Sequence, residues 1–276
     1  MAQDLKSLEA ASIRKNDFMK RSDGEKLPGQ TGALIINADD WGRDVDNTNR
    51  ILECYRRGTV SSASAMVYMK DSERAADAAK EHSVDVGLHL NLTTPFSEEH
   101  VEARLSEHHQ RVCQYLRGSR FAQVVFHPGL RSSFEYVVSS QIREFQRIYG
   151  QAPQRIDGHH HMHLCANVLW GKLLPAGTVA RRNFSFQLGE KGALNRWYRR
   201  KIDGTLAKRH KLTDYFYSLP PMDIPGRLER IFALATHHVV EVETHPINAV
   251  EHGFLMSESP FRRFGLDSIV SFRSLL

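Results

Sequence analysis

Short apolar runs alternate with amphipathic runs along most of this chain, and this alternation restricts the fold more than any other feature of the sequence. The runs with strand character are Ala33–Ala38, Val60–Tyr68, Val84–Leu92, Gln154–His159, Val179–Phe186 and His238–Thr244. The runs with helical character are Asp44–Gly58, Asp71–Glu81, Glu98–Leu116, Ser139–Tyr149 and Gly226–Thr236. Strands that alternate with helices are typical of parallel α/β sheets and barrels. We therefore expect an α/β fold whose active residues follow the carboxyl ends of the strands.

The length and composition fit one large globular domain. The chain has 276 residues, of which 41% are hydrophobic and 25% charged, and α/β barrels of roughly 250 residues commonly form a single domain. The first 30 residues are polar, contain no apolar stretch of the kind found in a signal peptide, and lead into a linker with Pro28 and Gly29. We expect a flexible N-terminal extension over residues 1–30 and a single domain over residues 31–276.

The charge balance argues against a nucleic-acid partner. The formal net charge is only +5, from 37 Lys and Arg against 32 Asp and Glu. The basic residues concentrate in Arg196–Lys211, which reads RWYRRKIDGTLAKRHK. Two interpretations remain open for this stretch: a solvated helix face or loop, and a contact for an acidic glycan, a lipid phosphate or nucleic acid.

The cysteines and the hydropathy indicate a protein of a reducing compartment without a membrane span. Cys54, Cys113 and Cys165 are widely spaced and form no CxxC pair, which argues against a disulfide framework and against a thiolate zinc site. No run approaches 18 consecutive apolar residues. We expect three buried, unpaired cysteines and a cytoplasmic location.

Polar residues follow the first predicted strand and interrupt the third. Asp39 and Asp40 lie in the sequence NADDWG directly after an apolar strand. Two neighbouring buried carboxylates repel each other unless a cation lies between them, so they form either a turn or a metal ligand with a free base beside it. His89 lies on the polar side of VDVGLHLNL together with Asn91, where it is either a core histidine or a ligand.

The densest polar cluster is the block DGHHHMH at Asp157–His163, which holds four of the 15 histidines. Neutral imidazole is the commonest metal ligand in proteins. If the block continued as extended backbone, Asp157, His159, His161 and His163 would share one face, and we expect a metal-binding or catalytic use. In EVETHP, Glu241, Glu243 and His245 share a face of the last predicted strand. They belong either to the edge of a strand at the surface or to an acid–base group.

These polar groups together predict a metal-assisted hydrolase. One carboxylate and two histidines form a ligand set that leaves positions open for water and substrate. A second aspartate and a distant histidine then act as general base and general acid.

The chain resembles the YdjC/ChbG-like carbohydrate deacetylase family. The resemblance rests on five blocks in matching order from about residue 33 to residue 250: ALIINADDWG at 33–42, RGTVSSASAMV at 57–67, VGLHLNLT at 86–93, QIREFQRIYGQAPQRIDGHHHMH at 141–163 and ETHP at 243–246. It implies an irregular (β/α) barrel similar to that of the polysaccharide deacetylases. It also implies removal of an N-acetyl group from an amino sugar or glycan precursor, with one divalent metal ion (Zn, Mg, Mn, Ni or Co).

The resemblance assigns roles to individual residues of this chain. It implies Asp40, His89 and His159 as metal ligands, Asp39 as the base that activates water, and His245 as the acid that protonates the leaving amine. The substrate contacts that it suggests are Trp41, Asn91, His161, His163, Arg181 and Arg182, of which the two arginines compete for one family position. Trp41 stands where the family usually has phenylalanine, and it is expected to reshape a sugar platform.

Two alternatives to an N-acetyl sugar deacetylase remain. The same site could hydrolyse another amide or an ester. A different class of protein would be a non-catalytic scaffold that binds a polyanion through residues 196–211. The expected partners are an N-acetylated sugar or glycan, and a homodimer is an assembly to test.

Overall fold

A computed structural model describes residues 32–119, 121–186, 191–264 and 268–275. Seven strands in this part of the chain form one parallel sheet in the order β5-β4-β3-β2-β1-β7-β6. Their bounds are β1 Ala33–Trp41, β2 Ser62–Ala65, β3 Val86–Leu90, β4 Arg155–Gly158, β5 Val179–Ala180, β6 Tyr215–Ser218 and β7 Val239–Thr244. The predicted flexible extension over residues 1–30 lies outside the described residues.

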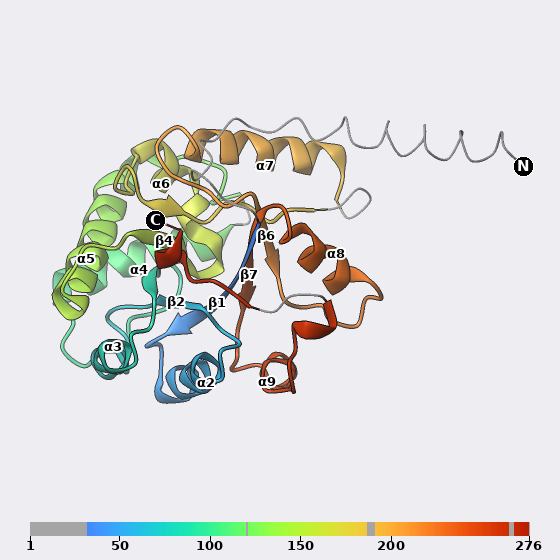
Figure 1. The fold of residues 1–276 in the computed structure, drawn as a ribbon. Helices are drawn as coiled ribbons and strands as arrows, with labels where there is room; N and C mark the ends of the chain where they lie inside the picture. Colours follow the sequence, from blue (N-terminus) through green and yellow to red (C-terminus); the bar gives the residue numbers. More distant parts are fainter. Residues whose placement is uncertain (1–31, 120, 187–190, 265–267, 276) are drawn as a thin grey trace, which may run out of the picture.

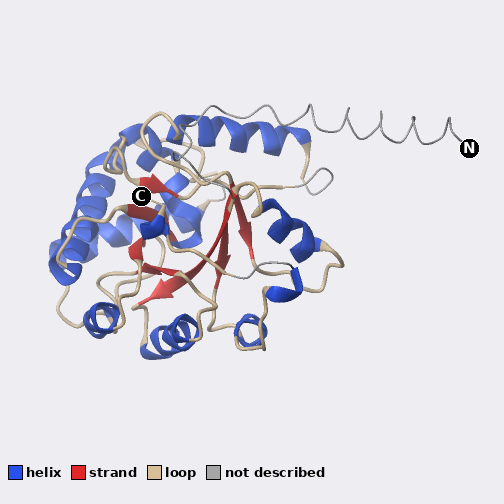
Figure 2. Cartoon of the chain, in the orientation of Figure 1, coloured by secondary structure: helices blue, strands red, loops and turns tan. Residues whose placement is uncertain are grey.

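The sheet curls until its two edges approach each other. Val179 of β5 forms a parallel bridge with Lys211, which precedes β6. The Ser185 N–H, which follows β5, donates to the Phe216 carbonyl of β6 at 2.8 Å. Helices lie around the outside of the strands (Figures 1 and 2). The predicted irregular (β/α) barrel is therefore confirmed.

The helices follow the strands as the alternation predicts. They are α2 Val45–Arg56, α3 Ser72–Glu81, α4 Ala103–Gly118, α5 Arg131–Tyr149, α6 Ala166–Gly171, α7 Ala193–Leu206, α8 Arg227–Leu234 and α9 Ala249–Leu255. Short 3-10 turns are η1 Pro128–Leu130, η2 His159–Leu164, η3 Arg262–Phe264 and η4 Phe272–Ser274. Local signals set several boundaries: the Asp44 carboxylate accepts from the Asn47 N–H at the start of α2, and Gly150 ends α5 at a φ of 76°.

Some predicted elements are shorter in the structure, and some elements of the structure were not predicted. The strand expected over Val179–Phe186 is regular only at Val179–Ala180. The aromatic strand β6 and the helices α6 and α9 were not predicted, because each is short and has no periodic pattern long enough to stand out. The basic stretch falls on α7 and the turn after it. Most of α7 is solvated, since among its residues only Asp203 and Leu206 are buried.

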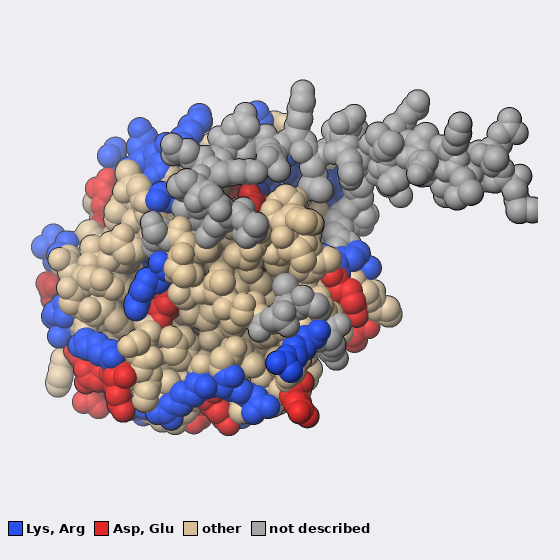
Figure 3. Space-filling view, in the orientation of Figure 1, with Lys and Arg blue, Asp and Glu red and all other residues tan. Residues whose placement is uncertain are grey.

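Charge is spread over the visible surface, and the three cysteines behave as expected. Figure 3 shows Lys and Arg side chains interspersed with Asp and Glu around the rim of the face it displays. Cys54, Cys113 and Cys165 are all buried and unpaired. In the described ranges, none of the helices combines the length and the apolar character that crossing a bilayer requires.

Candidate metal-binding active site

A bulge at the end of β1 brings two consecutive aspartates to one side of the sheet. In a regular strand, successive side chains point to opposite faces. Asp40 instead has a φ of 70°, and the pairing of β1 with β2 shifts register between Ala38 and Trp41. Aspartate adopts this left-handed conformation more readily than most residues. As a result, Asp39 Oδ2 lies 3.9 Å and Asp40 Oδ1 lies 3.6 Å from His89 Nε2.

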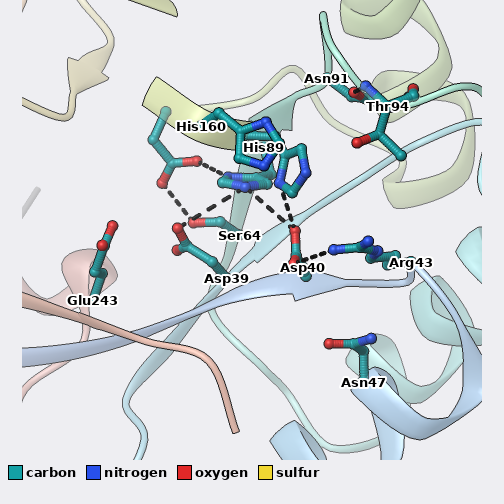
Figure 4. A network of polar contacts seen from close by, with 12 residues as sticks. Asp39, Asp40, Arg43, Asn47, Ser64, His89, Asn91, Thr94, His160 and Glu243 are labelled. Atoms are coloured by element: carbon teal, nitrogen blue, oxygen red, sulfur yellow. Dashed lines mark hydrogen bonds and ion pairs between the residues drawn. The ribbon is translucent and has the colours of Figure 1, made fainter. Parts of the chain in front are cut away.

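Asp40, His89 and His159 form a buried group of three candidate ligands. They come from β1, β3 and the first residue of η2, and their ligand atoms all lie within 4.8 Å of one another. His159 Nδ1 is 3.0 Å from Asp40 Oδ1. The exposed fractions of the three residues are only 2%, 1% and 5%. Figure 4 shows Asp40 and His89 pointing toward each other.

His89 Nε2 has no hydrogen-bond partner among the described residues, and Asp40 Oδ1 has only the 3.0 Å contact with His159 Nδ1, which lacks the alignment of a hydrogen bond. Leaving a buried polar atom unpaired costs about 1–3 kcal/mol. The second ligand atom of each residue is occupied: Asp40 Oδ2 accepts from Arg43 at 2.9 Å, and His89 Nδ1–H donates to Asp157 Oδ1 at 2.7 Å. Asp40 Oδ1 and His89 Nε2 are therefore the ligand atoms that face each other. A divalent cation between them fits this carboxylate–imidazole set.

Asp157 of β4 holds His89 in this orientation. Its Oδ2 accepts from Ser64 Oγ at 2.5 Å, while its Oδ1 accepts from His89. Burial alone would raise the pKa of Asp157, but Arg181 and His89 lower it to about 2. The ionised carboxylate fixes the imidazole tautomer that leaves Nε2 free as a ligand.

Arg181, which follows β5, binds the Asp39 carboxylate through two parallel hydrogen bonds. Its Nη1 donates to Asp39 Oδ2 at 2.6 Å and its Nη2 donates to Asp39 Oδ1 at 2.7 Å. Asn37 Nδ2 donates to the same carboxylate at 2.8 Å. Burial opposes ionisation, but Arg181 and the nearby His89 hold the pKa of Asp39 well below its usual range. Asp39 is therefore ionised at neutral pH.

Arg181 is shared by three more carboxylates. It donates from Nε to Glu241 at 2.7 Å, and its Nη atoms lie 3.3 Å from Glu243 and 3.1 Å from Asp157. Burial raises the pKa of both glutamates, and the neighbouring Asp39 raises that of Glu243 further. One fully buried guanidinium is thus the shared counter-charge of four carboxylates on the inside of the barrel.

The histidine block does not continue as extended backbone. After β4 the chain turns into η2, and His160 and His161 adopt left-handed φ values of 53° and 57°. Such conformations cost of order 1–3 kcal/mol each and occur often at functional sites. The expected common face of Asp157, His159, His161 and His163 is therefore wrong, because the turn sends the histidines in different directions.

His161 and His163, the later histidines of the block, contact Arg181 and its carboxylate partner Glu243 rather than Asp40. His163 is fully buried, and its Nε2–H donates to the Arg181 carbonyl at 2.8 Å. His161 Nε2 lies 3.7 Å from Glu243 Oε2, and its ring meets Phe184 edge-on. Burial and then Arg181 lower the pKa of His161 to about 3, so its imidazole is neutral at physiological pH.

His245 directly follows β7, at the same end of the sheet as the aspartates. Its backbone N–H donates to Glu251 Oε2 at 2.8 Å, and the residue is half-buried. His245 is close enough to contribute to the lowered pKa of Asp39. The four strand ends singled out in the sequence therefore converge on one region.

Three of the residues suggested as substrate contacts are engaged in other contacts of the protein. Trp41 is 0% exposed and donates from Nε1 to the Ala75 carbonyl of α3, so its ring is in the core and offers no platform. Asn91 is also fully buried, and its amide oxygen accepts from the Thr93 and Thr94 N–H groups of its own loop. Arg182 points toward α7, where it pairs with Asp203 at 3.0 Å. Of the two arginines, Arg181 faces the site.

The cluster also includes residues to which the family resemblance assigned no individual role: Asn37, Ser64, Asp157, Glu241 and Glu243. Three of them carried a usable signal, because Asp157 precedes the histidine block at a strand end and the period-2 alternation places both glutamates on the face of His245. Asn37 and Ser64 lie in apolar or small-residue strands with no such pattern.

The model of the YdjC-like protein family matches residues 33–255, which is most of the chain. This chain belongs to the YdjC-like family. Every residue of the candidate site, from Asn37 to His245, lies within the matched range.

Curated proteins similar to this YdjC-like chain include two named as deacetylases. A carbohydrate deacetylase of Danio rerio is 29% identical over 146 residues, which are 51% of this chain and 45% of that protein. A chitooligosaccharide deacetylase of Proteus mirabilis is 32% identical over 133 residues, which are 48% of this chain and 50% of that protein. The chain spans about half the length of these curated relatives.

A crystal structure supports the fold of this YdjC-like chain independently. It is that of a candidate cellobiose-phosphate cleavage protein from Enterococcus faecalis, with a TM-score of 0.61 and 21% sequence identity. The match covers 89% of this chain and 99% of that protein. At this identity the likeness bears on the fold alone.

Proposed function

We propose that this chain is a metal-dependent hydrolase that removes the N-acetyl group of an amino sugar or a glycan precursor. The observation that carries the proposal is the buried group of Asp40, His89 and His159, whose ligand atoms lie within 4.8 Å of one another directly beside the ionised carboxylate of Asp39. The deacetylase names of the similar proteins support the same activity and give its substrate class.

Asp40, His89 and His159 would hold the divalent cation in this proposal. When bound, such a cation polarises a carbonyl oxygen and lowers the pKa of water from 15.7 to about 7. Asp39 would accept the proton of the attacking water. Arg181 keeps Asp39 ionised, and its two hydrogen bonds hold the carboxylate in a fixed orientation toward the candidate ligands.

His245 is the proposed proton donor at the other side of the reacting amide. The amine must leave in protonated form, because an amide anion is a poor leaving group. His245 approaches the site from β7, while the candidate ligands come from β1, β3 and η2. A base and an acid on different strands can therefore act on opposite ends of the bond that breaks.

The His245→Gln variant is expected to lose about 100-fold or more in kcat for an N-acetyl sugar. The loss should be only a few-fold for p-nitrophenyl acetate, because its phenolate leaves without protonation. The rates of acetate and nitrophenolate release measure the two effects. Equal losses for both substrates would contradict the role of His245 as the acid.

The proposed activity is tested by acetate release from a panel of N-acetylated monosaccharides, chitooligosaccharides and simple esters. The full chain is assayed after chelation and after separate addition of Zn²⁺, Mg²⁺, Mn²⁺, Ni²⁺ or Co²⁺. We expect metal-dependent release from N-acetyl sugars, and also from an activated ester such as p-nitrophenyl acetate, whose leaving group needs no protonation. Hydrolysis confined to esters would replace the proposal with a different hydrolase. Absence of acetate, with polyanion binding that survives both chelation and Asp39→Asn, would favour a scaffold.

A further inference from the structure

The described segment 268–275 lies beyond the range that the family model matches, yet it packs into the barrel. Phe272 is buried against Ile35, Val179 and Val239, at the amino ends of the strands. The Val270 N–H donates to the Leu34 carbonyl at 2.8 Å, and the Arg273 N–H donates to Asp85 Oδ2 at 2.8 Å. Figure 1 shows this part of the chain next to β4. The segment therefore closes the end of the barrel opposite to the candidate site.

Phe272 contacts a buried arginine inside the barrel. The guanidinium carbon of Arg155 lies 4.4 Å from the centre of the Phe272 ring, within the range of a cation–π interaction. Arg155 is the first residue of β4 and is 3% exposed. Gly87 of β3 leaves room for it, because a Cβ at that position would lie 2.7 Å from the guanidinium carbon.

Arg155 in turn supports the carboxylate behind His89. Its Nη1 donates to Ser64 Oγ at 2.9 Å and to Asp157 Oδ2 at 3.3 Å, and its Nη2 donates to the Ala63 carbonyl at 2.8 Å. Ser64 also donates to Asp157 Oδ2. The opposite oxygen of Asp157 accepts from His89, so contacts run without interruption from Phe272 through Arg155 and Asp157 to a candidate metal ligand.

We propose that Arg155, held in place by Phe272, is a positioning residue for His89, and that segment 268–275 thereby sets the affinity of the site for a divalent cation. The inference rests on the metal site of the proposed function. Arg155 and Ser64 restrain Asp157 Oδ2 from the amino-end side of the barrel and act together with Arg181, whose Nη2 lies 3.1 Å from the same oxygen, which leaves Oδ1 in one orientation for the His89 ring. Without Arg155, both Ser64 and Asp157 lose a hydrogen-bond donor, and the imidazole samples more orientations in which Nε2 no longer faces Asp40.

The test is Zn²⁺ affinity of the full chain, measured by competition with a colorimetric chelator. Arg155→Met retains the length of the side chain without its charge or donors, and it should weaken Zn²⁺ binding about 10-fold or more. Phe272→Leu retains an apolar side chain but removes the aromatic ring, and it should weaken binding about 3-fold. Circular dichroism and thermal unfolding verify that each variant is folded.

Phe232→Leu is the matched control. Phe232 is a fully buried phenylalanine of α8 that packs against Phe261 and Phe264 and is not part of the contacts to Asp157. This variant should lose thermal stability comparably to Phe272→Leu and bind Zn²⁺ like the unaltered chain. A general loss of packing would move stability in both variants, whereas only the proposed positioning role separates their metal affinities.

Metal affinity also separates the failure of this inference from that of the proposed function. Unchanged Zn²⁺ binding in both Arg155→Met and Phe272→Leu would overturn the positioning role and leave the deacetylase proposal standing. Equal weakening in Phe272→Leu and Phe232→Leu would overturn it as well. An unaltered chain that binds no Zn²⁺ would overturn both, because the site itself would be absent.

Discussion

Asp39→Asn is expected to lower kcat for acetate release by about 10³-fold, within the range typical for loss of a general base, while the protein retains its metal. Asparagine keeps the shape of the side chain but cannot accept a proton from water. The three candidate ligands are other residues, and Asp39 Oδ2 is 3.9 Å from His89 Nε2. The measurement combines steady-state kinetics with elemental analysis of the bound metal.

His159→Ala is the paired variant for this prediction. It removes a member of the ligand group that lies 3.0 Å from Asp40, so it should lose both the metal and the activity. The contrast between the two variants separates a base from a ligand. Equal metal loss in both would show that these roles are assigned incorrectly.

Arg181→Met is expected to lower the free energy of unfolding by about 3–5 kcal/mol, the usual cost of leaving buried charges without their partner. Asp39, Asp157, Glu241 and Glu243 would then share the barrel interior without a counter-charge from Arg181. Mutual repulsion would raise the carboxyl pKa values in the folded state above those in the unfolded state. The folded state would therefore bind more protons, and the deficit should shrink as the pH falls from 8 to 5.

Arg182→Met is the control for this stability prediction. Arg182 is adjacent in the sequence but pairs with a single carboxylate, that of Asp203, so its loss should cost about 1–2 kcal/mol. Urea unfolding at several pH values measures both variants. Similar unfolding midpoints for the two variants would contradict the central role of Arg181 in the cluster.

Much of the fold could be predicted from patterns in the sequence. The period-2 alternation of Val84–Leu92 and the amphipathic runs of α2, α3 and α8 identified elements that the structure contains. Prediction failed where an element is too short to show a period, as at β6, or where the partner is distant. The residues after Ala180 look like a strand but leave the regular sheet, because only tertiary packing limits the pairing of β4 with β5 to two residues.

The sequence predicted which residues form the candidate site better than it predicted the contacts among them. The residue types at the strand ends indicated Asp39, Asp40, His89, the histidine block and His245 before any geometry was known. The choice between Arg181 and Arg182 was beyond the sequence, because adjacent residues differ only in the direction that the local backbone gives them. Trp41 was expected to reshape a sugar platform because it stands where the family usually has phenylalanine, but the structure places its ring in the core after the bulge at Asp40.

By itself the sequence determined the alternating α/β class, the family and the residues able to supply a cation site, because periodicity and residue chemistry are properties of single segments. Only the tertiary structure decided that Arg181 is shared by four carboxylates, that Asp157 orients His89, and that Phe272 reaches Arg155 from 117 positions away. These contacts join strands and segments far apart in the chain. They arise when the parallel sheet curls and brings the inward side chains of its strands into one buried interior.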